Sequence, residues 1–398
     1  MDRNTLNTAG APGRLYSWAL VVVFALLILT PSLAQIAGIG KQSGENRSLA
    51  EFPTLRSAKE IKDLTQKMDA YVNDRFGLRR QLVRLNSLIR FKLGISSSKD
   101  VVIGEDGWLF YTADSLMEQH TGADVFTPAE LDTWIDWIQS VRGCLVERDI
   151  AFYFIIAPDK NTIYPEKLPD YPRPPTATTR FDQVVNRLRR TNIDFIDPRE
   201  AMFEAKAQGI PIYHGGDTHW TKQGAYVAYE LFMDQLRRRF PSIVPVTLAD
   251  FDVGDSQRMA SDLAVLLALD RVIEYKVETL ERDTPSHLAE KPVRSMKPGW
   301  GWPVLEWHND LASQPRLLVF GDSFTDYILG PNFLYETFGD PVFTHHNNGT
   351  LNLNLIEEFN PDVVVLEMAD RYLHRLPLKP LGYDHVCRGA KYLGAGSN

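Results

Sequence analysis

Cysteine is scarce in this sequence. Its 398 residues include two, Cys144 and Cys387, which are too few for a disulfide scaffold and have no metal-ligand spacing. Two such residues can form a disulfide in an oxidising compartment or remain separate buried thiols, because sequence does not show whether their Cα atoms come close enough to bond. The scarcity excludes a small fold stapled by several disulfides and leaves the pairing of these two open.

An excess of basic charge is also missing. Lysine and arginine total 43 against 51 aspartates and glutamates, so the formal net charge is −8. The one basic run, Arg237-Arg238-Arg239, ends a predicted helix, where it complements the helix dipole. Nucleic acid is therefore excluded as a partner, and a polyanionic substrate would need a locally basic groove. No glycine-rich loop follows a predicted strand and no metal motif occurs, which excludes the usual phosphate-binding and metal sites.

One long apolar run is present near the N-terminus. Leu15 to Leu29 is almost wholly apolar and follows Arg3 and Arg14, which is typical of an exported chain. The tripeptide Ser32-Leu33-Ala34 would suit signal-peptide cleavage, whereas the uncharged stretch from Leu15 to Ile36 could span a membrane. We expect residues 1–40 to be an uncleaved anchor, with a signal peptide as the alternative. Either choice places the rest of the chain in the periplasm, and the anchor would hold it at the inner membrane.

Residues 41–100 are predicted to lead into the main domain. They contain a short polar linker and then two amphipathic helices that break near Gly77. Residues 101–398 are predicted to form one large domain, because they contain enough apolar residues to bury a full core. Its first elements are a predicted hairpin over Val101 to Tyr111 and a predicted helix over Pro128 to Val146.

Short apolar runs alternate with helical stretches in this domain. The alternation predicts an α/β fold, a parallel sheet with helices on both faces. The predicted strands are Ile150 to Ala157, Ile193 to Ile196, Leu317 to Phe320 and Val363 to Met368. Active sites in such sheets lie at the carboxyl ends of the strands, where Asp159, Lys160, Ser323, Asp370 and Arg371 are expected to emerge.

Two motifs supply the groups of an acyl-transfer triad. In Gly216-Asp217-Thr218-His219-Trp220, His219 is the candidate base and Asp217 the carboxylate that orients it, and in Gly321-Asp322-Ser323-Phe324, Ser323 is the candidate nucleophile. A serine hydroxyl is a weak nucleophile until an imidazole takes its proton, and the imidazole needs a carboxylate to hold its tautomer. Strand, turn, serine and helix predict a nucleophile elbow, with the Ser323 N–H as the first oxyanion donor.

Ordinary turns also contain Gly-Asp-Ser. A second copy, Gly254-Asp255-Ser256, follows no buried strand, so we expect a turn there. After Ser323 we expect a helix from Thr325 that Pro331 interrupts, with Tyr327 in a packing role and not a site role.

The two triad motifs, with the helix predicted from Lys222 to Phe240, resemble those of the AlgJ/AlgX-like alginate O-acetyltransferase group in the SGNH-hydrolase-like superfamily. Three further segments fit that group, Asp74-Arg75-Phe76-Gly77-Leu78-Arg79, Gly104-Glu105-Asp106-Gly107-Trp108-Leu109-Phe110 and Pro158-Asp159-Lys160. The resemblance runs from about Glu51 to about Arg375. It includes a permuted order in which the Asp-His pair precedes the serine. About seventy residues follow Ser323, too few for another domain, so the AlgJ branch is the more similar one.

This resemblance implies an O-acetyltransferase that places acetyl on hydroxyls of an exopolysaccharide, alginate or similar, through an acetyl ester on Ser323. It implies a multispanning membrane acyltransferase as acetyl donor, and the chemistry needs no metal or organic cofactor. Two alternatives stay open, a carbohydrate acetylesterase in which water is the acceptor, and a non-catalytic scaffold of a polysaccharide secretion complex.

Further site residues are predicted less directly. Lys160 and Arg371 are candidates for binding a substrate carboxylate or sugar hydroxyl, with salt-bridged rim positions as the alternative. A polar loop contains His345, His346 and Asn347. By resemblance to the superfamily, Asn347 or the neighbouring Asn348 is a candidate second oxyanion donor.

Overall fold

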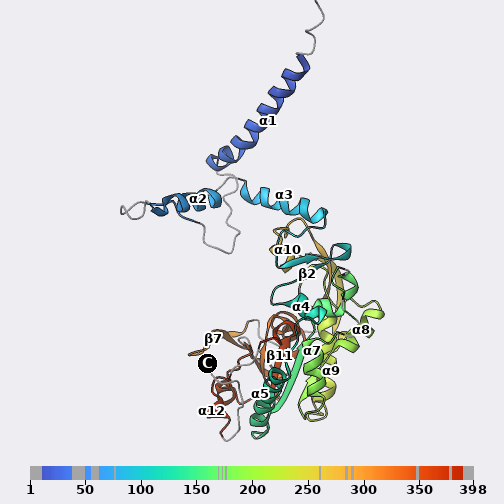
Figure 1. The fold of residues 1–398 in the computed structure, drawn as a ribbon. Coiled ribbons are helices and arrows are strands. Elements are labelled where there is room, and N and C mark those ends of the chain that lie inside the picture. The colour runs from blue at the N-terminus through green and yellow to red at the C-terminus, as the bar shows by residue number, and fades with distance from the viewer. Residues whose placement is uncertain are drawn as a thin grey trace, which may run out of the picture. The chain divides into compact units, whose positions relative to one another are not determined.

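The computed structural model describes residues 11–37, 50–54, 62–75, 78–168, 170–172, 174, 177–259, 261–282, 286–287, 291–346, 349–375 and 379–388. The chain divides into two compact units, Met1–Leu93 and Gly94–Asn398 (Figure 1). The first contains α1 (Ala11–Ile36), α2 (Leu64–Arg75) and α3 (Arg79–Lys92). The two helices predicted on either side of Gly77 are α2 and α3. No helix in the described part of the chain is both long and apolar enough to cross a bilayer.

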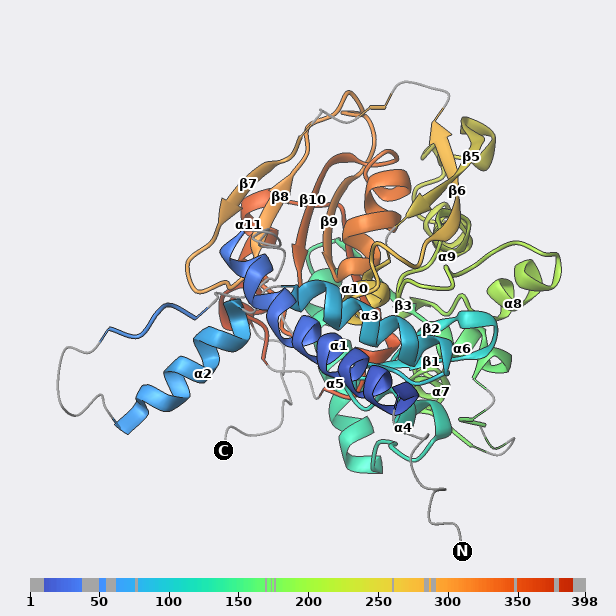
Figure 2. The ribbon, with the colours of Figure 1, turned by 90° about the horizontal axis from the view of Figure 1, so that it is seen from above.

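Seven strands of the second unit form one sheet within the described residues, in the order β4-β3-β11-β9-β10-β8-β7. Figure 2 shows β7, β8, β10 and β9 side by side in this order. The strands are β3 (Ala151–Ala157), β4 (Asp194–Ile196), β7 (Val293–Met296), β8 (Pro303–Glu306), β9 (Arg316–Gly321), β10 (Gly339–His345) and β11 (Val363–Ala369). Neighbours from β4 to β10 are parallel, and β8 and β7 add antiparallel at one edge. The predicted α/β fold and its four strands are confirmed, whereas β7, β8 and β10 were not predicted.

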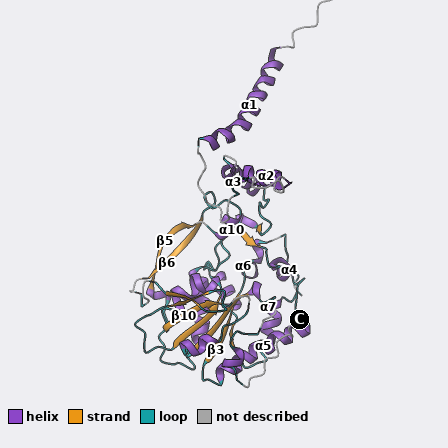
Figure 3. Cartoon of the chain, turned by 90° about the vertical axis from the view of Figure 1, so that its left-hand side faces the viewer, coloured by secondary structure: helices purple, strands orange, loops and turns teal. Residues whose placement is uncertain are grey.

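The sheet separates two apolar layers. Along β3, Tyr153 and Ile155 belong to one layer and Phe152 and Phe154 to the other, because strand side chains alternate between faces. The first layer includes α9 (Lys222–Leu236) and η5 (Thr325–Leu334), and the second includes α5 (Pro128–Val146), α7 (Arg180–Leu188), α11 (Asn354–Phe359) and α12 (Tyr383–Val386). Helices therefore cover both faces, as predicted (Figure 3).

Side-chain caps fix where two of these helices begin. The Thr127 hydroxyl accepts the Glu130 N–H, and the Glu130 carboxylate accepts the Thr127 N–H, so α5 begins at the predicted residue. The Thr221 hydroxyl accepts the Gly224 N–H at 2.9 Å and caps α9. That helix ends at Leu236 and the chain continues as a turn, so it is shorter than the predicted helix.

Two hairpins are separate from the main sheet. β1 (Val101–Ile103) and β2 (Leu109–Tyr111) pair antiparallel around η2 (Glu105–Gly107), which confirms the predicted hairpin. β5 (Phe251–Met259) and β6 (Tyr275–Arg282) form the second. Gly254-Asp255-Ser256 lies within β5, so the predicted turn is wrong. β6 supplies the backbone partners, and a register shift between Gly254 and Gln257 absorbs the irregularity. The remaining elements are α4 (Leu116–Thr121), α6 (Lys160–Ile163), η3 (Pro165–Lys167), α8 (Arg199–Ala207), η4 (Leu248–Asp250), α10 (Asp262–Leu266) and η6 (Asp370–Tyr372).

The segment after Ser323 differs from the prediction. Pro331 does not interrupt it, because η5 is a π-helix that continues through this proline to Leu334. A proline ring clashes with the carbonyl four residues earlier in an α-helix, and the wider π turn avoids that contact.

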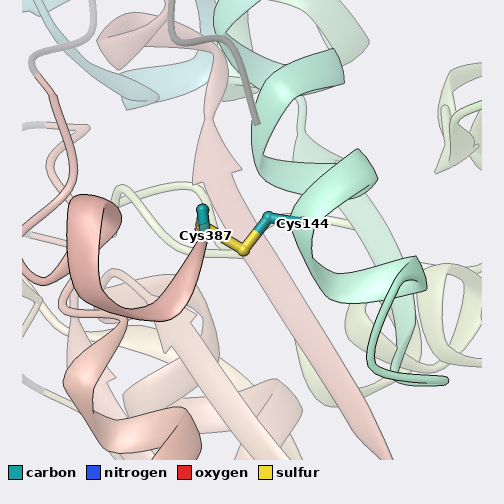
Figure 4. The surroundings of a disulfide bond; sticks show 2 residues. All are labelled: Cys144 and Cys387. Atoms are coloured by element: carbon teal, nitrogen blue, oxygen red, sulfur yellow. A yellow bond between two sulfur atoms is a disulfide. The ribbon is translucent and has the colours of Figure 1, made fainter. Parts of the chain in front are cut away.

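A disulfide joins Cys144 to Cys387 and settles the pairing that sequence left open (Figure 4). Cys144 lies near the end of α5, and Cys387 directly follows α12. The bond therefore ties two helices of the second layer that are 243 residues apart in sequence.

Candidate active site

The candidate nucleophile lies where β9 ends. β9 stops at Gly321, and Ser323 is the first residue of the helical segment that continues into η5. Residue 321 has to be glycine because a Cβ there would lie 2.9 Å from the Cβ of Thr325. Ser323 is half-buried, and its N–H has no carbonyl partner one turn back because it opens a helix. These residues form the strand, turn, serine and helix of an elbow.

The candidate base lies on a loop that leads into α9. A β-bridge between Tyr213 and Trp220 closes this loop. The buried Lys160 Nζ donates to three backbone carbonyls of residues 214–217, at 2.7 to 3.2 Å. A Cβ at Gly216 would overlap the ring of Tyr275, so the ring packs directly on the loop backbone. The loop is therefore held from two sides.

The structure brings Ser323, His219 and Asp217 together. His219 Nε2 lies 2.8 Å from Ser323 Oγ, and His219 Nδ1 lies 2.7 Å from Asp217 Oδ1. Burial alone would raise the pKa of Asp217, but the hydrogen bond and charge of His219 hold that pKa well below its ordinary value. The ionised Asp217 fixes a proton on Nδ1 and leaves Nε2 to accept the proton of the serine. This arrangement can activate Ser323 for attack on an acyl carbon.

A second carboxylate, that of Asp262, is hydrogen-bonded to the loop that carries Asp217 and His219. Asp262 opens α10, accepts the Thr218 N–H at 3.0 Å and also accepts the Thr218 hydroxyl. Its own N–H donates to Asp217 Oδ2 at 3.3 Å. Burial and then the charge of Asp217 raise the pKa of Asp262. Sequence reasoning missed this residue, because a single aspartate at a helix start carries no catalytic pattern.

Asp217, His219 and Asp262 also place three potential metal-ligand atoms within 4.8 Å of one another. Both nitrogens of the His219 ring already face protein partners, Asp217 on one side and Ser323 on the other. The hydrogen bonds of His219 to Asp217 and Ser323 therefore account for the geometry of this cluster.

A sequence profile described as SGNH hydrolase-like domain, acetyltransferase AlgX, matches residues 101–359, more than half of the chain. The chain belongs to this AlgX family. It is 24% identical over 347 residues to the probable alginate O-acetylase AlgJ of Pseudomonas aeruginosa, covering 82% of this chain and 85% of that protein. It is 27% identical over 348 residues to the protein of the same description from Pseudomonas syringae pv. tomato, covering 82% and 83%. The family resemblance predicted from the motifs is confirmed.

Solved structures in the comparison include the O-acetyltransferase domain of Pseudomonas putida AlgJ, which is 19% identical with a TM-score of 0.46 and covers 69% of this AlgX-family chain and 92% of that chain. Bacillus cereus PatB1 with a sulfonyl adduct is 16% identical with a TM-score of 0.48, covering 70% and 100%.

Two candidate substrate-binding residues of this AlgX-family chain lie in the interior. Lys160 is 4% exposed, and burial lowers its pKa to about 7. Arg371 is 6% exposed, its Nη2 pairs with Asp159 Oδ1 at 2.9 Å, and its guanidinium lies 5.2 Å from the Phe324 ring centre. Both cations are buried and have protein partners, Lys160 the loop carbonyls and Arg371 the carboxylate of Asp159.

The polar loop after β10 is described in part. Asn347 and Asn348, the candidate second oxyanion donors, lie outside the described residues. His345 is half-buried, with its ring 4.5 Å from that of Trp302. His346 is buried, accepts the Gly349 N–H on Nδ1 at 3.0 Å, and directs Nε2 toward Asp322.

An exposed aromatic residue lies beside the candidate base. Tyr327 is 65% exposed, and its ring meets that of His219 edge-on with centroids 5.4 Å apart. Tyr327 therefore packs against His219 from a largely exposed position on η5. Phe324 is fully buried, and its ring packs against that of His219 with the ring centroids 5.1 Å apart.

Proposed function

We propose that this AlgX-family chain is an O-acetyltransferase that places acetyl groups on hydroxyls of an exopolysaccharide, alginate or a similar polymer. The hydrogen-bonded chain from Asp217 through His219 to Ser323 carries the proposal. The description of the family and the names of the AlgJ relatives support it.

The proposed first step loads acetyl onto the protein. Ser323 Oγ attacks the acetyl carbonyl carbon while His219 Nε2 takes the hydroxyl proton, and Asp217 stabilises the imidazolium. The tetrahedral oxyanion faces the Ser323 N–H at the start of the helix. When the C–O bond to the donor breaks, His219 returns the proton to the leaving oxygen, and an acetyl ester remains on Ser323.

The second step transfers acetyl to sugar. His219 removes the proton of a sugar hydroxyl, whose oxygen attacks the ester carbon, and Ser323 leaves with the proton that His219 gives back. These steps use side chains and backbone of this chain and route nothing through a metal or an organic cofactor. Tyr327 lies on the solvent side of His219, where an acceptor ring would approach.

The burial of the two candidate cations suggests a different role for them. We propose that Lys160 holds the Asp-His loop through its backbone carbonyls, and that Arg371, paired with Asp159, supports Phe324 under His219. The charge needed to attract a polyanion would then come from other residues.

Export and a membrane partner belong to the same proposal. We assign residues 1–40 to an inner-membrane anchor or a signal peptide, residues 41–100 to a connecting segment and residues 101–398 to a periplasmic catalytic domain. The disulfide supports an oxidising compartment. Acetyl would come from a multispanning membrane acyltransferase. A C-terminal alkaline phosphatase fusion should be active, and an active cytosolic reporter instead would contradict export.

A first experiment tests the triad with a chromogenic acetyl ester and the full chain. Ser323→Ala should abolish acetate release, whereas Ser313→Ala, in an exposed turn, should not change it. Asp217→Asn should lower kcat by roughly 10⁴-fold, because the wrong imidazole tautomer is favoured. Asp234→Asn on the exposed side of α9 is its matched control. Undiminished turnover by a folded Ser323→Ala protein would rule out the triad.

A second experiment separates transfer from hydrolysis, since the half-buried Ser323 also admits the acetylesterase alternative. With an acetyl donor and oligosaccharides of the host polymer, acetylated sugar should appear by mass spectrometry. Transfer in water at roughly 55 M requires the acceptor to be held in a near-attack position. If acetate release is fast, no oligosaccharide alters it and no acetylated sugar appears, the acetylesterase function should replace the proposed transferase function.

A further inference from the structure

A buried glutamate lies directly under the candidate nucleophile turn. Glu367 is fully buried in the sheet on β11, the strand directly next to β9. Its Oε2 accepts the backbone N–H of Asp322 at 3.0 Å and the hydroxyl of Thr325 at 2.8 Å. The glutamate therefore contacts the chain on both sides of Ser323, although it takes no part in the proposed acyl transfer.

A second carboxyl group completes the support. Asp322 is 5% exposed, and its side chain accepts the Phe324 N–H at 2.9 Å and the Ala369 N–H at 2.8 Å. The amides immediately before and after that of Ser323 are thus both taken by buried carboxyl groups. The Ser323 N–H lies between them and remains available for an oxyanion.

The two carboxyl groups share one buried space and hold at most one negative charge, because like charges at close range cannot both be desolvated. Asp322 has two N–H donors, and His346 Nε2 lies 3.9 Å from its Oδ2. Glu367 Oε1 is buried without a hydrogen-bond partner among the described residues. Tyr335 and Tyr213, two titratable neighbours of Glu367, are buried and have raised pKa values. The groups that interact with the charge of Asp322 are Asp159, His345, Arg371 and Tyr372.

The pKa values agree with this distribution. Burial and then the charge of Asp322 raise the pKa of Glu367 well above its ordinary value. Burial opposes ionisation of Asp322 too, yet the His346 ring and the Phe324 and Ala369 N–H groups hold the pKa of Asp322 below its ordinary value. Asp322 therefore carries the charge and Glu367 carries the proton at neutral pH.

We propose that Glu367 is a positioning residue that stays protonated during turnover and fixes the nucleophile turn through the Asp322 N–H and the Thr325 hydroxyl. The inference rests on Ser323 being the nucleophile. Ionised Glu367 would place a second negative charge beneath the Ser323 N–H, where it would oppose the oxyanion of the tetrahedral intermediate. Since the folded-state pKa is raised, the neutral form is present at low and neutral pH and is lost as pH rises through that value. Activity should therefore decline at alkaline pH through Glu367.

Two substitutions and a pH profile test the proposal with the full chain and a chromogenic acetyl ester. Glu367→Leu removes the acceptor and should lower kcat at least tenfold, with a smaller change in KM. Glu367→Gln keeps an acceptor oxygen and cannot ionise, so it should recover most of the lost kcat and should lack the alkaline decline of the native protein. The infrared absorbance of protonated buried carboxyl groups should fall in Glu367→Gln, because the contribution of Glu367 is lost.

Several outcomes would contradict the proposal. A folded Glu367→Gln protein with kcat as low as Glu367→Leu, or with the native alkaline decline, would overturn it, as would an unchanged infrared band. If Glu367→Leu does not fold, the pH profile and the infrared band of Glu367→Gln still test the proposal. Ser323→Ala is assayed in parallel. Turnover by that variant would remove the proposed function itself, whereas an inactive Ser323→Ala with a failed Glu367→Gln result would remove this inference alone.

Discussion

Tyr327 has an exposed ring next to His219, the candidate base. If the acceptor sugar stacks on this ring, Tyr327→Ala should raise the KM for oligosaccharide acceptors severalfold and change the release of acetate from a small ester less. Tyr327→Phe keeps the ring and should restore the acceptor KM. Equal acceptor KM values for the alanine variant and the native protein would show that the acceptor binds elsewhere.

The candidate triad could be predicted at the residue scale because its groups occur in two short motifs. Asp262 and Glu367 could not, because each is a lone carboxyl brought to the site by a separate element. The positions of Lys160 and Arg371 at strand ends were predictable, but their burial depends on packing that the sequence does not display.

Two glycines give a matched pair at the scale of elements. A Cβ at Gly216 would overlap the Tyr275 ring in the loop before α9, whereas a Cβ at Gly143 within α5 would have nothing within 4 Å. Gly216→Ala should displace His219 and lower kcat strongly. Gly143→Ala should leave kcat unchanged and stabilise the protein by about 0.5–1 kcal/mol through helix propensity. Ester hydrolysis and urea unfolding of both variants measure this, and normal kcat in Gly216→Ala would contradict the assigned packing.

Elements with strong local patterns agreed with their predictions. The capping box of Thr127 and Glu130 marks the start of α5, and the apolar runs of β3 and β11 match buried parallel strands. β10 was missed because Gly339 and Pro341 resemble a turn, and β5 because Gly254 does. These strands exist because neighbouring strands supply backbone partners, which is a long-range effect.

Asp370 should give the whole molecule a pH-dependent stability. Burial and then the charge of Asp159 raise the pKa of Asp370 to about 7, against 3.8 ordinarily. The contribution of protonated Asp370 to the free energy of unfolding is fully present below pH 4. It is lost as pH rises through about 7, because the folded chain binds the proton more tightly than the unfolded chain does. Asp370→Asn should therefore raise the free energy of unfolding at pH 8 by up to about 2.5 kcal/mol relative to its effect at pH 5. Urea unfolding at both pH values, with Asp234→Asn as control, measures this, and a pH-independent difference would contradict it.

The disulfide should stabilise the second unit as a whole. It closes a loop across 243 residues, so removing it should lower the free energy of unfolding by roughly 2–5 kcal/mol. Cys144→Ser and Cys387→Ser should lower the melting temperature by similar amounts, and the double variant should add little, because either change breaks the same bond. Native melting temperatures in both single variants would show that the bond does not form in solution.

The long separation of these cysteines also bears on how the protein matures. If the chain crosses the membrane from its N-terminus, the thiol of Cys144 emerges 243 residues before that of Cys387. Cys144 therefore has no internal partner until the rest of this segment has crossed. During that interval it is exposed to oxidants and to thiols of other proteins. Once Cys387 arrives, however, the chain offers a single internal pairing, because no third cysteine exists. Maturation should therefore depend on a thiol oxidase and be indifferent to a disulfide isomerase.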